Sequence, residues 1–400
     1  MRVRQMNKQY DKYSKKRMLF SGKFQFNGKK LKLAREIRSM TTTELAGEID
    51  VSHQMISKYE KGENIPQEEK IRLISQALQF PRTFFFTSYF LENNDRTSPN
   101  FFRKGAAVAK KYQIQVEANT TISVGIKKYL ESKLKLPKFI MPNFALVQKE
   151  FRQLDFNDIE DTANALRDLF NLQRGPIGNI TLLCERMGIG VFFADLDSAK
   201  IDAHTVFVDD TPYIILNKER KSSVRMRFNI AHELGHILLH SHYQEKDVAN
   251  SSNHRRIEDE ADHFAGCLLL PGDGLALDMA ASNLTYLISL KKHWKASIQA
   301  IIYRSEQLGL FSSNHTLHLR QQISRNSWRK FEPLDDEIPI EEPQVLKQAI
   351  QVLLKNNIIT VEELEMELGL TMEMIQEYCL GRNCYEAKEI KFQNNVVSLF

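Results

Sequence analysis

The sequence predicts a helix-dominated α+β protein. Apolar residues recur at helical spacing over most of the 400 residues, whereas one stretch, 188–217, has the β-branched and aromatic runs and the turn residues typical of strands. The chain is also too long for one core, since single cores rarely exceed about 250 residues. We therefore expect two or three domains, with one small sheet among many helices.

The composition is that of a folded protein. Apolar residues make up 42% of the chain and charged residues 26%. No run approaches the roughly 20 apolar residues of a membrane span, and the basic start lacks the apolar segment of a signal peptide. The four cysteines are scattered without a CxxC pair, so neither a disulfide framework nor a cysteine zinc site is indicated. We expect a cytoplasmic protein with no membrane partner.

Charge is distributed unevenly along the chain. Residues 1–40 hold thirteen Lys and Arg against Asp11 and Glu36, a net charge of +11, although the whole chain carries only +5. The rest of the chain therefore totals −6, and residues 334–378 hold eleven acidic residues but two lysines. A basic head on an acidic body indicates a polyanionic partner at one end. A solvated charged surface is the alternative.

Short helices separated by turns are predicted between residues 28 and 79. Thr43 or Thr42 is expected to cap the second helix and Ser52 the third, which Gly62 and Pro66 end. Helices this short are stable only when they pack on one another. Their apolar positions are Leu31, Ala34, Ile37 and Met40; Leu45, Ala46 and Ile49; Met55, Ile56 and Tyr59; and Ile71, Ile74 and Leu78.

The second and third of these helices have the layout of a helix–turn–helix. The former ends near Asp50, and the latter runs over 53–59 with its apolar side toward its neighbour. The opposite side presents groups of the kind that read base edges and neutralise phosphates in double-stranded DNA. These candidate DNA contacts are Ser52, His53, Gln54, Ser57, Lys58 and Lys61. A head that only packs, or that docks a partner protein, is the alternative.

The remaining chain divides by pattern into a connector, a mixed region and a helical tail. Helices are predicted over 105–135, 158–171, 178–187, 223–240 and 255–270, a strand in GIGVFFADL, a hairpin in TVFVDDTPYIILN, and a strand near KFQNNVVSLF at the end. The predicted boundaries are 1–26 for a basic leader, 27–86 for the helix–turn–helix domain, 87–139 for a linker and connector helix, 140–330 for the mixed region, and 331–400 for a mainly helical C-terminal region.

The run NIAHELGHILLH, residues 229–240, places polar groups inside an apolar helix. Residues four apart share one helix face about 5–6 Å apart, so His232 and His236 can bind one zinc ion. Glu233 lies beside them, where it can act as a general base on a water at that metal. Two surface histidines with a flanking glutamate are the alternative. The apolar surroundings argue against it, because buried polar groups without partners are costly.

A third ligand within the same segment is not favoured. His242 matches the third histidine of metzincins, but Leu239 stands where that pattern needs glycine. His240 lies one turn farther along, and three histidines on one straight helix face span about 12 Å, too far for a single ion. We interpret His240 as a C-terminal helix residue that meets the helix dipole.

The helix predicted over 255–270 offers a carboxylate instead. Glu260 borders its apolar stripe, whereas Glu258 and Asp262 point away from it. A carboxylate at the edge of a core requires a cation, and two histidines with one glutamate form a catalytic zinc site with one open position. We therefore expect Glu260 as the third ligand. His263, one turn from it, is the competing residue, or else an ordinary exposed histidine.

Two parts of the sequence resemble known families. ELA at 44–46, VS at 51–52, IS at 56–57 and YEKGENIP at 59–66 resemble the Cro/CI-type (XRE) helix–turn–helix family. RFNIAHELGHILLH followed by EDEADHFAGCLLLP resembles the ImmA/IrrE metallopeptidases, and this likeness covers roughly 160–275. It implies a zincin-like metallopeptidase domain with one Zn²⁺ per chain. His232, His236 and Glu260 match the metal-ligand positions and Glu233 the general-base position.

The resemblance also implies a function. Members of this family act on helix–turn–helix repressors, so the first hypothesis is a DNA-binding zinc endopeptidase that cleaves a repressor or similar regulatory protein. The alternative is a transcriptional regulator whose peptidase-like domain senses a ligand or metal without proteolysis. A third is a partner protein that neutralises a basic toxin through the acidic C-terminal helices. A homodimer is left open.

Two features of a peptidase site remain open. The residue that stabilises the oxyanion must be chosen among Tyr213, His204, Tyr243 and Arg225. The strand at 213–217 can pair with a peptide substrate if it lies at the edge of the sheet, and is an ordinary strand if it is central.

Overall fold

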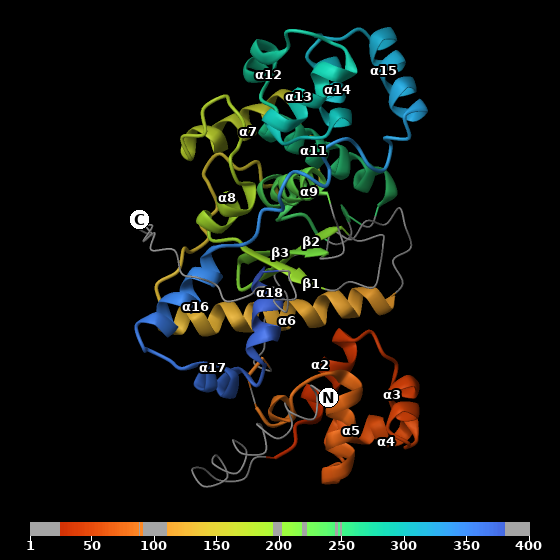
Figure 1. Cartoon of the computed structure of the whole chain (residues 1–400), viewed down its shortest axis with the longest axis vertical. Coiled ribbons are helices and arrows are strands. Elements are labelled where there is room, and N and C mark those ends of the chain that lie inside the picture. Colours follow the sequence, from red (N-terminus) through yellow and green to blue (C-terminus); the bar gives the residue numbers. More distant parts are fainter. Residues whose placement is uncertain are drawn as a thin grey trace.

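The computed structural model of the chain describes residues 25–87, 89–90, 110–194, 202–217, 222–244, 247–248 and 250–380. A small sheet lies at its centre, between the long helix α6 (Lys110–Lys133) and the helices of the mixed region (Figure 1). The helix-dominated α+β class is confirmed. The predicted leader, apart from residues 25 and 26, and the strand predicted near the end of the chain lie outside the described residues.

The head, residues 25–87, is a bundle of short helices on the far side of α6 from the sheet (Figure 1). It holds α2 (Gly28–Ile37), α3 (Thr42–Glu48), α4 (His53–Lys61), α5 (Glu68–Leu78) and the 3-10 turn η1 (Arg82–Phe86). Leu31, Leu45, Ile56 and Ile74 are fully buried at its centre. Packing of these apolar sides therefore holds the short helices together.

The helix caps of the head follow the sequence with one correction. The Ser52 hydroxyl accepts a hydrogen bond from the Met55 N–H (3.2 Å) at the start of α4, and Gly62 ends α4 with a φ of 74°. The cap of α3 is Thr41, not Thr42 or Thr43. Thr41 is favoured because Glu44, three residues later, completes a reciprocal capping box with it.

Three strands form the described sheet. They are β1 (Gly190–Ala194), β2 (Ala203–Val208) and β3 (Thr211–Asn217). The predicted hairpin is β2 and β3, joined through Asp209 and Asp210 with positive φ of 49° and 59°, as in a two-residue type I′ turn. β3 is central, parallel to β1 and antiparallel to β2. Strand 213–217 is therefore an ordinary central strand and has no free edge for a peptide.

Each face of the sheet belongs to a different hydrophobic core. Phe192 and Ile215 pack in a core shared with α6, the head and the C-terminal helices. Phe193, Ile214 and Leu216 pack in the core of the mixed region. The split follows from the pleat, which points successive side chains to opposite faces. The head and the mixed region are thus joined through one sheet.

Helices of the mixed region cover the second face. They are α7 (Phe156–Leu169), α8 (Ile180–Arg186), α9 (Ser223–Gly235), the π-helical turn η2 (His236–His240), α11 (Ser251–Leu269), α12 (Gly272–Asp278), α13 (Leu284–Trp294), α14 (Ile298–Gln307) and α15 (Ser313–Arg325). The helix predicted over 223–240 is therefore α-helical only as far as Gly235. No helix within the described ranges combines the length and the hydropathy that crossing a bilayer requires.

The C-terminal region returns to α6 and the sheet (Figure 1). Its helices are α16 (Val345–Lys355), α17 (Val361–Leu368) and α18 (Met372–Leu380). The segment before α16 is fixed by buried charges: Glu185 accepts hydrogen bonds from the backbone of Gln344 and Val345 (2.8 and 2.9 Å), and Arg227 is paired with Glu341. The acidic segment 334–378 is therefore packed against the rest of the described chain.

Candidate metal centre

His232 and His236 lie on adjacent turns of one buried segment. His232 belongs to α9, and His236 begins the π-helical turn η2. Their Nε2 atoms are 3.0 Å apart, with the ring planes at 87° to each other. Both nitrogens face the same point. Two bare nitrogens repel each other at this distance, so a proton or a cation must lie between them.

A carboxylate from a second helix completes the group. Glu258 of α11 places Oε1 3.4 Å from His236 Nε2 and Oε2 3.8 Å from His232 Nε2. Donor atoms of the three residues all lie within 4.8 Å of one another. Two ligands of one tetrahedral zinc ion are about 3.4 Å apart, because each bond is about 2.0–2.1 Å long. His232, His236 and Glu258 therefore fit zinc in donor type and in spacing.

Glu260, the third ligand expected from the sequence, lies away from this group. Its fully buried carboxylate places Oε2 3.0 Å from His240 Nε2. Oε1 accepts hydrogen bonds from the Leu154 N–H (2.8 Å) and from Arg256 Nε (2.7 Å). The expectation is corrected: Glu258, which the apolar stripe predicts to point away from the core, is the carboxylate beside the two histidines.

The correction has a physical reason, which is that α11 is buried on two sides. It packs on both α7 and α9, so its apolar stripe does not mark the side that faces the histidines. That side carries Glu258 and Ala261. The close approach occurs at Gly235, where a Cβ would lie only 3.2 Å from the Ala261 Cα. The glycine of HELGH therefore lets α11 bring its carboxylate to the site.

The protonation states of His236 and Glu258 suit metal binding, whereas zinc would have to displace a proton that Asp262 favours on His232. Burial lowers the pKa of His236 to about 4. Burial alone would raise the pKa of Glu258, but its contact with His236 and the charges of His236 and His232 lower it to about 2. Asp262 Oδ1 lies 2.7 Å from His232 Nδ1, and this contact outweighs burial and raises the pKa of His232. A neutral imidazole and an ionised carboxylate are the forms that bind zinc.

Glu233 is buried next to these residues. Its side chain is 8% exposed, and Oε2 makes no hydrogen bond to the part of the chain that the structure describes. Burial raises its pKa. A carboxyl group with a raised pKa both accepts and returns a proton more readily near neutral pH. Glu233 therefore has the environment of a general base.

Several other sequence candidates are engaged elsewhere. Tyr213 packs on the α6 side of the sheet, and His204 points to the same side by strand alternation. The Tyr243 hydroxyl donates to a backbone carbonyl (3.0 Å), and Arg225 Nη2 donates to the Arg329 carbonyl (3.2 Å). The Tyr243 hydroxyl thus already uses its only proton, and Arg225 directs one of its N–H groups to the C-terminal segment. His242 is exposed.

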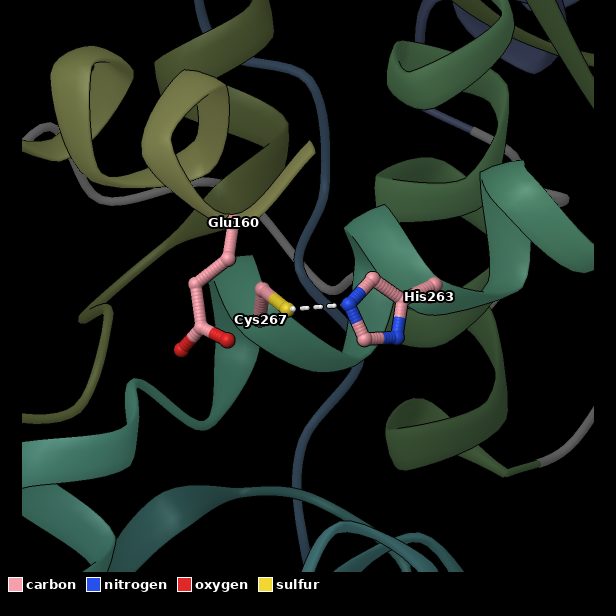
Figure 2. Close-up of side chains that lie close together, drawn as sticks. All are labelled: Glu160, His263 and Cys267. Atoms are coloured by element: carbon pink, nitrogen blue, oxygen red, sulfur yellow. Dashed lines mark hydrogen bonds between the residues drawn. The ribbon is translucent and has the colours of Figure 1, made fainter. Parts of the chain in front are cut away.

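A second set of metal-ligand side chains occurs on α11 (Figure 2). His263 and Cys267, one turn apart, place Nε2 and Sγ 3.5 Å apart, and Glu160 of α7 lies beside them. Glu160 is ion-paired with Arg304, and Gln307 Nε2 is 3.3 Å from His263 Nδ1. His263 is thus neither a ligand of the first site nor an exposed histidine, since only 9% of it is exposed.

In the head, the candidate DNA contacts form the outer side of α4. Ile56 and Tyr59 are buried against the bundle. The candidates are exposed, except for Ser57, which is half-buried: Ser52, His53, Gln54, Ser57, Lys58 and Lys61. The structure therefore gathers them on one accessible face.

Comparisons with known proteins agree with both motifs. The family model for the IrrE N-terminal-like domain, of the M78 peptidases, matches residues 184–306, and a helix-turn-helix family model matches residues 31–85. The chain therefore combines a helix–turn–helix domain with an IrrE-like domain, and the two resemblances seen in the sequence are confirmed.

More distant comparisons add little to these two matches. Among solved structures, a Mycobacterium tuberculosis transcriptional regulator matches with 18% identity and a TM-score of 0.28. The match covers 38% of this chain and 46% of that one, so it spans less than half of either. No curated protein matches the chain.

Proposed function

We propose that this protein is a DNA-binding regulator whose IrrE-like domain is a zinc-dependent endopeptidase, with a regulatory protein such as a helix–turn–helix repressor as its substrate. The observation that supports this most strongly is the meeting of His232, His236 and Glu258 next to the buried Glu233. These residues come from two separate helices, so the site exists only in the folded chain. Sensing of a metal or ligand alone would give no role to Glu233.

The metal ligands in this proposal are His232, His236 and Glu258. Three protein ligands leave one position of a four-coordinate site for water or substrate, as in catalytic rather than structural zinc sites. A zinc ion held there supplies Lewis-acid activation of the scissile carbonyl and of the attacking water.

Glu233 carries the proton through the reaction. It accepts a proton as the water oxygen adds to the carbonyl carbon, and it delivers that proton to the amine nitrogen as the C–N bond breaks. Burial raises its pKa, and a carboxyl group above its usual pKa range accepts a proton more readily and can still return it.

The decisive experiment compares wild type with Glu233→Gln. The amide keeps the size of the side chain but cannot accept the proton, so cleavage of a co-encoded repressor should fall about 100- to 10,000-fold. Zinc content and DNA binding should be unchanged. Asp259→Asn, an exposed acid on α11, is the matched control and should cleave normally. Equal cleavage by wild type and Glu233→Gln would reject the peptidase and favour sensing.

DNA binding by the head is tested by its dependence on salt. Lys58 and Lys61 are expected to neutralise phosphates, so the affinity for operator DNA should fall steeply between about 50 and 200 mM salt. Gln54→Ala should weaken operator binding more than binding to unrelated DNA, because it removes a contact to a base edge. Fluorescence anisotropy measures both effects. Absent or salt-independent binding would indicate that the head docks on a protein instead.

A further inference from the structure

A chain of hydrogen bonds leads from the proposed metal ligand His236 into the interior. His236 Nδ1 is 3.0 Å from His240 Nδ1, and His240 Nε2 is 3.0 Å from Glu260 Oε2. The three side chains are 2%, 0% and 0% exposed, so water does not compete for these contacts. The chain ends on Arg256 and on the Leu154 N–H, which both donate to Glu260 Oε1.

Only one placement of protons satisfies this chain for neutral imidazoles. Glu260 takes two N–H donors at Oε1, so it acts as a carboxylate acceptor, and His240 must carry its proton on Nε2 to donate to Oε2. His240 Nδ1 is then bare and accepts, so His236 must carry its proton on Nδ1. That leaves His236 Nε2 as the unprotonated ring nitrogen, and this nitrogen faces His232 Nε2 and the Glu258 carboxylate.

Local backbone geometry sets this contact. Both histidines lie in η2, whose π-helical hydrogen bonds enclose one more residue per turn than an α-helix. The sequence instead predicts a straight α-helix in which His240 meets the helix dipole. The structure corrects this, because His240 is fully buried and its ring also stacks on Tyr243, with 5.5 Å between centroids.

The two histidine ligands are held in different ways. His232 donates directly to Asp262, whose side chain is 45% exposed. His236 instead reaches its carboxylate through a second imidazole, and that carboxylate is fully buried. Histidine ligands almost always donate their second N–H to such a partner, which fixes the ring and its tautomer.

We propose that His240 and Glu260 are positioning residues that fix His236 as a metal ligand, by holding its proton on Nδ1 and leaving only Nε2 to bind the ion. The inference rests on the proposed zinc site. It gives a role to Glu260, which the sequence predicts to be a metal ligand.

The first test needs no variant and no metal. In metal-free wild-type protein labelled with ¹⁵N-histidine, the ring nitrogen chemical shifts identify the tautomer of each imidazole. We expect the Nδ1–H form for His236 and the Nε2–H form for His240. The opposite form at either ring, or fast exchange between the two forms at His236, would overturn the inference.

The second test compares His240→Phe with His240→Gln. Phenylalanine fills the space of the ring but offers no polar atom, whereas glutamine offers both an acceptor and a donor. Zinc affinity, measured by competition with a chelator, should weaken about 10- to 100-fold in His240→Phe. Most of this loss should be restored in His240→Gln. Thermal unfolding of the metal-free proteins checks that both variants fold. Asp262→Asn is the matched variant for His232, because it removes the carboxylate that holds that ring and should also weaken zinc affinity.

Two results of this series would overturn the inference: an unchanged zinc affinity in His240→Phe, or equal losses in the two variants, which would indicate packing alone. Failure of the proposed function is recognised separately. A wild-type protein that binds zinc but cleaves no substrate would reject the peptidase, while the affinity series and the tautomers would still test His240 and Glu260.

Discussion

Two groups of metal-ligand side chains share helix α11, and only one of them is arranged for a metal. In the first, the Nε2 atoms of His232 and His236 converge at 3.0 Å beside the carboxylate of Glu258. In the second, His263 and Cys267 lie 3.5 Å apart beside Glu160 (Figure 2). Both contain three side chains of kinds that bind zinc. Proximity of such side chains is therefore not enough to identify a metal site.

The difference between the groups lies in charge balance. Glu160 is already neutralised by Arg304, whose side chain is 2% exposed. Burial raises the pKa of the Cys267 thiol to about 12, so this group stays protonated and neutral. The charges of the second group are thus already balanced without a metal ion. The first has an ionised carboxylate facing two imidazole nitrogens, which is the arrangement that a cation stabilises.

The largest expected effect is that of Glu258→Ala, which should remove zinc from the protein. The variant loses one of three ligands, and the two histidines alone hold the ion too weakly to survive desalting. Metal analysis should find one zinc per wild-type chain and almost none in the variant. Glu160→Ala is the control for the second group and should keep one zinc. Loss of zinc in Glu160→Ala, with zinc retained in Glu258→Ala, would reverse the comparison.

A smaller effect, on stability, is expected from Glu160→Gln. The substitution leaves Arg304 buried without its counter-charge, which should lower the free energy of unfolding by about 1–3 kcal/mol. Urea denaturation measures the loss. Asp161→Asn, the exposed neighbour on α7, should change stability by less than about 0.5 kcal/mol. An unchanged stability in Glu160→Gln would show that the ion pair does not account for the position of Glu160.

The smallest effect is an expected lack of reaction at Cys267. With a pKa near 12, roughly one thiol in ten thousand is ionised at pH 8, and the thiolate fraction rises only as the pH approaches 12. Alkylation at pH 8 followed by mass spectrometry should leave Cys267 unmodified in the native protein and modified in urea. Cobalt-substituted protein should also lack a thiolate-to-cobalt absorption band. Such a band, lost in Cys267→Ser, would make the second group a metal site.

Much of the fold was predictable from local signals in the sequence. Ser52 and Gly62 mark the ends of α4 because caps act within a few residues. Asp209 and Asp210 mark the hairpin turn in the same way. Which strand is central was not predictable, since β1 pairs with β3 across a gap of about twenty residues and no local pattern encodes that pairing. The packing of the acidic tail against α6 is equally non-local.

The site was predictable only where it is local. His232, Glu233 and His236 follow from one motif on one helix. The third carboxylate depends on how α11 is rotated against α9, and a helix buried on two sides has two faces that a hydrophobic stripe does not distinguish. Glu258 and Glu260 lie about 200° apart around the helix, so taking the wrong one of these two buried faces exchanges them. His240 was misassigned for another reason, because a π-helical turn leaves no signature in spacing.

The three-stranded sheet, with one core on each face, couples the stability of the head to that of the mixed region. A substitution at Phe192 should loosen the core on the side of the head, and the same strand carries Phe193 into the core of the mixed region, which holds the proposed metal centre. Unfolding of either core must therefore remove the strands from the other core, because both cores include the same three strands. DNA binding by the head and the proposed metal binding of the mixed region are thus expected to be lost together on heating, because both cores depend on the same strands.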